Sequence, residues 1–176
     1  IGFRMKGRMK LAKKLIGDIP DEWEYAKFKE LYKSPIRDFG SFSSTKLITF
    51  LDDGIPFIKS EMIHDGRIDW TNVFYISKEV HRKLNKSHVS TGQILLSKIG
   101  SALGKAVVYE GGRGVCNSNA AIAKITLDEK KADSNYYCYL LNHAVSKRQF
   151  KRLIISLLPR INLGDIDSLI QPLPPV

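Results

Sequence analysis

Three short apolar runs separated by glycine-rich turns limit what this chain can fold into. The runs are 94–96, 105–109 and 120–127, and the turns between them are 97–104 (SKIGSALG) and 110–114 (EGGRG). Runs this short are typical of strands, and glycine-containing turns between them indicate antiparallel pairing. We expect the first two runs to pair across the turn at Gly100 and Gly104, with 120–127 as the third strand of this meander.

The rest of the chain predicts short strands and a few helices. Strands are expected at 23–31, 55–63, 66–70, 73–77 and near the C-terminal end. Helices are expected at 5–16, from Ser77 to about 84, over 135–156 after a cap at Ser134, and briefly before the last strand. The sequence therefore predicts an α+β fold, a twisted, mostly antiparallel sheet with peripheral helices.

The glycines at 100–104 raise the question of nucleotide binding, because Gly104 is followed by Lys105. A phosphate-binding loop needs four residues between its glycines, a Ser or Thr after the lysine, and a helix next. Here three residues separate the glycines, Ala106 follows the lysine, and the next segment is β-branched. The sequence therefore argues against a nucleotide site.

A search for catalytic motifs finds only fragments. His81, Asn85 and His88 lie close in sequence but lack the flanking hairpin of a histidine–metal nuclease. A Pro-Asp at 20–21 and an acidic-x-Lys at 129–131 are far apart, and the short catalytic and cofactor motifs of a DNA methyltransferase are missing. The G-x-S-x-G motif of the α/β-hydrolases is absent as well. We expect no catalytic residue and no bound metal.

The charge balance indicates a polyanionic partner. The 28 basic and 18 acidic residues give a net charge of +10 and a pI of about 9.6. Lys and Arg that neutralise phosphates release counterions and gain affinity. The two cysteines, Cys116 and Cys138, have no metal-ligand spacing, and no apolar run is long enough for a membrane span. We expect one main domain in a reducing cytoplasm, with no membrane contact.

Polar and basic residues gather in the predicted loops, where recognition chemistry usually lies. Arg and Lys suit guanine edges and phosphates, Asn suits adenine, Glu suits cytosine and Ser suits either. We expect Lys98 and Lys105 to contact phosphates, Ser101 to lie near a base edge, and Arg113 and Asn119 to distinguish bases. The full set of DNA-binding candidates is Lys59, Ser60, Glu61, Lys98, Ser101, Lys105, Arg113, Asn117, Asn119 and Arg160.

The order of the segments resembles a known family. The segments are IPDEWEYAKFKEL, DDGIPFIKSEMI, VSTGQILLSKIGSALGKAVVY, CNSNAAIAKI and RINLGDIDSLIQPLPPV. Together they resemble the target recognition domain of the specificity subunit of type I restriction-modification systems, from residue 19 to residue 176. The resemblance implies sequence-specific binding to one half of a bipartite site in double-stranded DNA.

The resemblance also implies partners. A non-catalytic domain of this kind, without its own cofactor, directs separate methyltransferase and restriction subunits, which bind S-adenosylmethionine and ATP, in a prokaryotic cytoplasm. Two half-sites need a dimer or a second recognition domain, and residues 1–18 are expected to form a basic helix that ends a spacer helix. The alternatives are a protein-interaction module or a fragment of a DNA-modifying enzyme, a nuclease or a methyltransferase.

Overall fold

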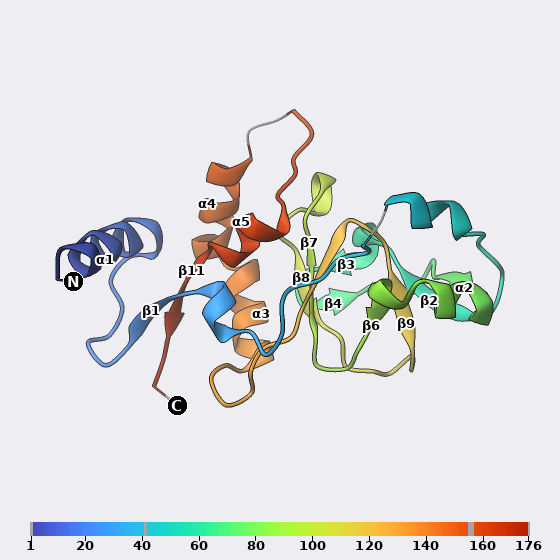
Figure 1. Ribbon diagram of the computed structural model, residues 1–176, viewed down its shortest axis with the longest axis horizontal. Helices are drawn as coiled ribbons and strands as arrows, with labels where there is room; N and C mark the ends of the chain where they lie inside the picture. Colours follow the sequence, from blue (N-terminus) through green and yellow to red (C-terminus); the bar gives the residue numbers. More distant parts are fainter. Residues whose placement is uncertain (1, 41, 155–156, 176) are drawn as a thin grey trace.

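The computed structural model describes residues 2–40, 42–154 and 157–175, and the side chains of 9–40, 44–154 and 157–175. The elongated molecule carries α1 at one end and the α2 region at the other (Figure 1). Its helices are α1 (Gly2–Ile16), α2 (Lys78–Lys83), α3 (Ser134–Asn142), α4 (Ala144–Leu153) and α5 (Leu163–Asp167). Among them, none combines the length and apolar character that a membrane span requires.

A three-stranded sheet of β7 (Ile94–Ser97), β8 (Ala106–Val108) and β10 (Ile122–Ile125) lies at the centre. Both pairings are antiparallel, and the strand order is β10-β7-β8. The predicted pairing of 94–96 with the following run is confirmed. The predicted meander is wrong, because the third strand joins the free side of β7 rather than β8.

A second sheet has the order β5-β2-β9-β6. It is built from β2 (Ile55–Ile58), β5 (Phe74–Ile76), β6 (His88–Val89) and β9 (Cys116–Ser118). β2 and β9 are parallel, whereas the other pairs are antiparallel. The chain reaches β9 directly after β8, so the 110–114 turn connects two different sheets.

Two small antiparallel pairs complete the strands. β3 (Ile63–His64) pairs with β4 (Arg67–Ile68) across the expected turn at 64–66. β1 (Glu24–Lys27) pairs with β11 (Ile170–Leu173), so a segment that follows α1 lies beside the last strand of the chain. The mixture of helices with mostly antiparallel strands confirms the predicted α+β class.

The central sheet separates two apolar cores because its side chains alternate between its faces. Ile94, Leu96 and Ile125 face the helices α3, α4 and α5, where Tyr137 and Phe150 also pack. On the other face, Leu95 and Ile122 belong to a second core with residues of β2, β3 and β9. The cores hold the loops at the strand ends in fixed relative positions.

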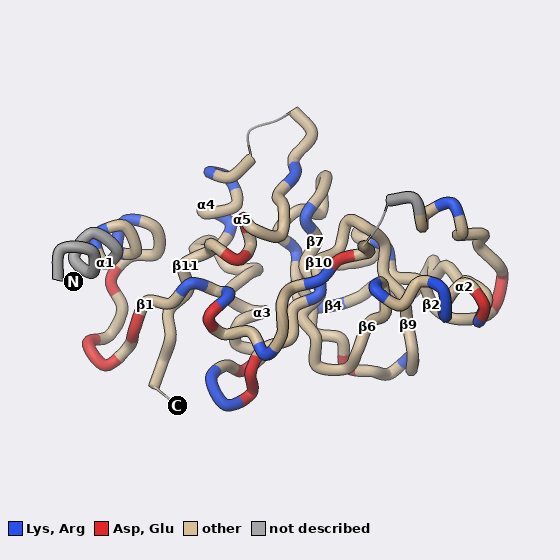
Figure 2. The backbone as a smooth tube through the Cα atoms, viewed as in Figure 1, with Lys and Arg blue, Asp and Glu red and all other residues tan. Residues whose placement is uncertain are grey.

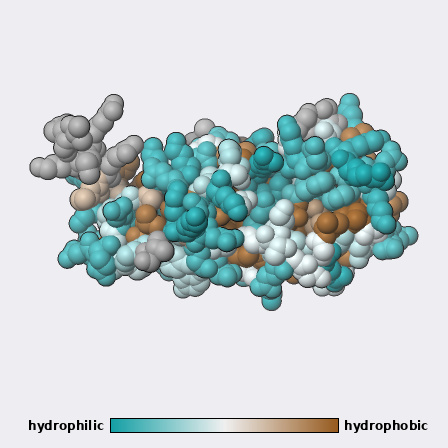
Figure 3. All heavy atoms as spheres, turned by 60° about the horizontal axis from the view of Figure 1, so that its bottom comes forward, coloured by the Kyte–Doolittle hydropathy of each residue, from teal (hydrophilic) through white to brown (hydrophobic). Residues whose placement is uncertain are grey.

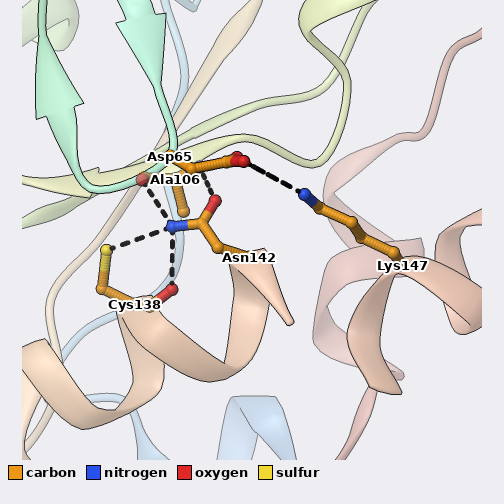
Figure 4. Close-up of polar contacts among 5 residues, drawn as sticks. All are labelled: Asp65, Ala106, Cys138, Asn142 and Lys147. Carbon is orange, nitrogen blue, oxygen red and sulfur yellow. Dashed lines mark hydrogen bonds and ion pairs between the residues drawn. The ribbon is translucent and has the colours of Figure 1, made fainter. Parts of the chain in front are cut away.

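One amide side chain of α3 forms hydrogen bonds to β8, which is an edge strand of the central sheet. The Asn142 Nδ2 atom donates to the Ala106 carbonyl oxygen at 2.8 Å, and the Asn142 Oδ1 atom accepts from the Ala106 N–H at 2.8 Å. Figure 4 shows this pair beside an ion pair between Lys147 of α4 and Asp65 of the β3–β4 turn. The side-chain amide thus pairs with this edge residue as a neighbouring strand would.

The helix predicted over 135–156 is instead two helices. Asp133 caps α3 by accepting from the Tyr136 N–H, and Ser134 is already helical. His143 has extended backbone dihedrals and ends α3, and its side chain accepts from the Val145 N–H at the start of α4. A periodic apolar pattern does not reveal such a break, because the stripe continues through it.

Candidate nucleic-acid interface

The parallel pairing of β2 with β9 brings two predicted loops to one edge of the second sheet. Phe57 lies opposite Asn117, and Ile58 opposite Ser118. The segments that follow these strands therefore leave the sheet side by side, and the Asn119 N–H donates to the Ile58 carbonyl at 2.9 Å. Residues 59–62 and 119–121 are neighbours although they lie far apart in the sequence.

Two more loops join the same edge. The Lys98 N–H donates to the Ala121 carbonyl at 2.8 Å, which places the 98–105 connection beside 119–121. Gly100 N–H donates to the Pro159 carbonyl at 2.8 Å, and Ile161 N–H to the Lys98 carbonyl at 3.0 Å. We call the segments 59–62, 98–105, 119–121 and 157–161 the four-loop edge. It lies along the top of Figure 1.

The four-loop edge contains most of the predicted DNA-binding residues. Glu61, Ser101 and Arg160 are exposed, Lys59, Lys105 and Asn119 are half-buried, and Ser60 is buried. Arg160 lies directly beside the 98–105 loop, through an antiparallel bridge with Ile99. Tertiary structure therefore brings together polar groups from four separate parts of the sequence.

Four residues of the edge, Lys59, Ser60, Glu61 and Asn119, have partners within the chain. The Lys59 ammonium lies 3.3 Å from the centre of the Phe74 ring, and Ser60 Oγ donates to Glu61 Oε2 at 3.4 Å. The Asn119 Oδ1 atom accepts from the Ala121 N–H at 3.2 Å, which fixes the turn after β9. These contacts hold Lys59 and Asn119 in defined orientations before any ligand is bound.

Lys98 differs from the prediction made for it. Its side chain is 5% exposed, and its ammonium pairs with Asp38 Oδ2 at 3.4 Å. A second lysine, Lys124 of β10, is also buried and donates to the Asp38 carbonyl at 2.7 Å. Burial lowers the pKa of Lys124 to about 8, although the Asp38 charge opposes the change. We withdraw the predicted contact between Lys98 and phosphate, because its ammonium lies inside the protein.

Asn117 is buried as well, within a hydrogen-bond network. Its Nδ2 atom donates to the Leu84 carbonyl at 3.2 Å and to Ser87 Oγ, and its Oδ1 atom contacts His81 Nδ1. The rings of His81 and His88 stack face to face at a centroid distance of 4.0 Å, so their nitrogen atoms do not point toward one shared metal position. No cluster of three potential metal ligands occurs in the described part of the chain. Asn117 links α2 to β9, and its predicted role in DNA binding is withdrawn.

Arg113 lies away from the four-loop edge. β8 begins at the 98–105 loop and ends at the 110–114 turn, so the turn is at the opposite end of this strand. There the exposed Arg113 guanidinium lies 5.3 Å from the centre of the Trp70 ring. Arg113 and the four-loop edge therefore form separate surfaces.

The glycines of the 98–105 loop serve the fold. Gly100 and Gly104 have φ values of 74° and 83°, which favour glycine over other residues. A Cβ at Gly104 would lie 2.8 Å from Phe150 Cδ2 of α4. The loop backbone at Gly104 therefore packs closely against α4 and leaves no room for a side chain.

The second half of α4 forms a basic surface next to the four-loop edge. Arg148, Lys151 and Arg152 are exposed, and α4 lies against the 98–105 loop through Phe150. Residues 134–164 contain no Asp or Glu. This absence is the feature of the sequence from which a basic surface at α4 could have been predicted.

The two sides of the molecule differ in charge. In Figure 2 the segments at the top, α4 and the loops beside β7, carry Lys and Arg, whereas the lower turns carry both basic and acidic positions. Figure 3 turns the lower side toward the viewer and shows mostly hydrophilic residues, with apolar residues in separate patches. Basic residues therefore outnumber acidic ones in the four-loop edge and in α4.

Comparison with known proteins relates the sequence to specificity subunits. No family model matches the chain. It is 27% identical to the "Putative type I restriction enzyme MjaX specificity subunit" of Methanocaldococcus jannaschii, over 92% of this chain and 38% of that protein. The MjaVIII specificity subunit of the same organism is 24% identical over 80% of this chain and 32% of its own length. The chain thus spans well under half of each relative.

Solved structures give the same result for the fold. The HsdS subunit from Thermoanaerobacter tengcongensis matches 99% of this chain with a TM-score of 0.60 at 17% identity, over 41% of that subunit. The S subunit of the type I system from M. genitalium matches 88% with a TM-score of 0.55 at 15% identity, over 35% of its length. The predicted resemblance to type I specificity subunits is confirmed in sequence and in fold.

Proposed function

We propose that this chain is a DNA target recognition domain of a type I specificity subunit and that it binds one half of a bipartite duplex sequence through the four-loop edge. The likeness to specificity subunits supports this proposal, together with the gathering of polar and basic loops at one edge. Loops on a rigid frame are the usual carriers of recognition, and a surface with more basic than acidic side chains suits a phosphate backbone.

The geometry divides the proposed contacts into two groups. Lys105 and the α4 cations Arg148, Lys151 and Arg152 would contact phosphates and position the domain on the duplex. Side chains at the centre of the edge would contact bases, since their donors and acceptors suit base edges. These are Lys59, Glu61, Ser101, Asn119 and Arg160, whereas Ser60 is buried and its hydroxyl donates to Glu61.

Further parts of the proposal follow from the family. The domain is non-catalytic and has no cofactor of its own, and it directs methyltransferase and restriction subunits in a prokaryotic cytoplasm. A second recognition domain or a dimer supplies the other half-site. The α1 helix, Gly2–Ile16, is proposed as part of a spacer helix, with the recognition domain beginning near residue 19.

Selection from a randomised duplex library tests the proposal. The chain is incubated with the library at moderate salt, and the bound fraction is sequenced. We expect one short motif to be enriched. Salt-sensitive binding without enrichment would contradict half-site recognition by this chain alone, and no binding even at low salt would contradict DNA binding altogether.

Two arginines provide a matched pair of variants for the same selection. Arg160→Ala should relax the preference at one position of the motif by about tenfold, since a good base contact contributes about 1–3 kcal/mol. Arg113→Ala should leave the motif unchanged, because Arg113 lies at the other end of β8. If the preference at one position were lost with Arg113→Ala and kept with Arg160→Ala, the DNA would bind at the 110–114 turn, and the proposed interface at the four-loop edge would be wrong.

A further inference from the structure

The most exposed large apolar side chain in the described part of the chain lies at the four-loop edge. Leu157 is fully exposed, with a relative accessibility of 105%, and Leu158 beside it is 65% exposed. Single exposed leucines are common on protein surfaces and need no explanation alone. The position of these two leucines needs an explanation, because the tip that the 157–161 segment forms lies at the top of Figure 1, between α4 and the 98–105 loop of the proposed DNA surface.

The segment behind this tip is firmly attached. Its two backbone hydrogen bonds to the 98–105 loop, from Gly100 to Pro159 and from Ile161 to Lys98, form a short antiparallel bridge. Ile161 is 1% exposed and packs in the core beneath α4 and α5. Pro159 fixes one further backbone angle. Two apolar side chains therefore project from a rigid base.

The residues next to the tip in the sequence are basic, which favours a negatively charged partner such as DNA. The exposed Lys151 and Arg152 precede it at the end of α4, and the exposed Arg160 follows it. No acidic residue occurs between 134 and 164. Apolar side chains at the centre of a basic surface are found in proteins that insert into the DNA minor groove and partly unstack a base step, while Lys and Arg contact the adjoining phosphates.

We propose that Leu157 and Leu158 form an apolar wedge that enters the minor groove of the target duplex, partly unstacks one base step and kinks the DNA. The inference rests on the proposed function. It adds a source of specificity that needs no hydrogen bond, since pyrimidine–purine steps such as TA and CA are the easiest to unstack. The selected motif should therefore contain such a step at one fixed position.

Fluorescence of 2-aminopurine tests the wedge directly. The base analogue replaces adenine at each position of the selected duplex in turn, and its emission rises when it loses a stacking neighbour. With the wild-type chain we expect a severalfold rise at the pyrimidine–purine step alone, and a bend in a permuted-duplex gel assay. Leu157→Ala should abolish the rise, reduce the bend and weaken specific binding about tenfold, while non-specific binding stays the same.

Two further variants separate insertion at the tip from a general effect of apolar surface or of charge. Leu51→Ala, at another exposed leucine outside the four-loop edge, should leave fluorescence and bending unchanged. Leu157→Lys should lose the fluorescence rise yet bind every duplex more strongly, because it adds a charge near phosphates. A Leu157 variant that keeps the rise and the bend would overturn the wedge.

The outcomes distinguish the wedge from the function on which it rests. If the wild-type chain binds its selected motif without a fluorescence rise at any position, the wedge is wrong and DNA recognition stands. If the chain binds no duplex, both proposals fail. If Leu157→Ala changes only the binding of a protein subunit, the tip is a protein contact and the wedge is overturned.

Discussion

Two buried lysines share one aspartate beneath the four-loop edge, which is an unusual arrangement for such charged groups. Lys98 and Lys124 both contact Asp38, through its carboxylate and its carbonyl oxygen respectively. Lys124 also lies 3.4 Å from Ser118 Oγ. The contacts tie the 37–39 segment to β10, so they fix part of the frame that carries the loops.

The lowered pKa of Lys124 predicts a specific pH dependence of stability. The unfolded chain keeps the proton up to the ordinary pKa of 10.5, whereas the folded chain releases it near 8. Between these values the unfolded chain binds more protons, so the free energy of unfolding rises with pH. From about pH 7.5 to about pH 9.5, wild type should gain about 2 kcal/mol relative to Lys124→Met, measured by urea unfolding.

The comparison with Lys124→Met removes the titration of the tyrosines and cysteines, which both proteins share. Lys130→Met, at an exposed lysine of the 128–133 turn, serves as the control and should show no such difference. An unfolding free energy that stays parallel between wild type and Lys124→Met across this range would contradict the lowered pKa.

At the scale of elements, α3 is attached to the central sheet both by apolar packing and by the amide of Asn142. Asn142 pairs with both backbone groups of Ala106, and the Gly66 N–H donates to the same carbonyl at 2.9 Å. Ala106 is fully buried, so its N–H has no access to water when the amide is removed. A buried donor without an acceptor costs about 1–3 kcal/mol.

Asn142→Leu should therefore lower the free energy of unfolding by about 2–3 kcal/mol, measured by chemical denaturation. Asn135→Leu provides the matched control, since Asn135 is exposed on the first turn of the same helix, and it should stay within about 0.5 kcal/mol of wild type. Equal unfolding midpoints for the two variants would show that apolar packing, rather than the amide, holds α3 in place.

At the scale of the whole molecule, the basic residues form separate groups on different parts of the surface. The α4 cations and Lys105 lie on the side of the four-loop edge, whereas Lys130 and Lys131 lie beyond the far end of β10. Each phosphate contact contributes about 0.9 to the slope of log affinity against log salt concentration.

The double variant Lys151→Gln, Arg152→Gln should therefore reduce that slope by about 1–2 and weaken binding to every duplex alike. Lys130→Gln, Lys131→Gln carries the same change of net charge and should leave the slope almost unchanged. Titration of a labelled duplex at several salt concentrations measures both. Equal effects of the two variants would mean that net charge alone, rather than this surface, attracts the DNA.

Elements with a clear local signal were predicted well from the sequence. The helix after Ser77 has the expected cap, with the Val80 N–H donating to Ser77 Oγ, and the 94–96 run pairs with its successor as expected. The wrong predictions concern features without a local signal. The break at His143 interrupts no apolar stripe, and the position of β10 beside β7 depends on which side of the sheet the helices leave open.

The sequence by itself determined the kind of fold, the sign of the charge and the pool of polar loop residues, because these depend on composition and on short-range patterns. Only the tertiary structure decided which of those residues act together. The parallel pairing of β2 with β9 and the bridge between Ile99 and Arg160 bring four loops to one edge. The same packing buries Lys98 and Asn117 and puts Arg113 at the other end of β8, because burial and proximity arise from contacts between residues distant in the chain.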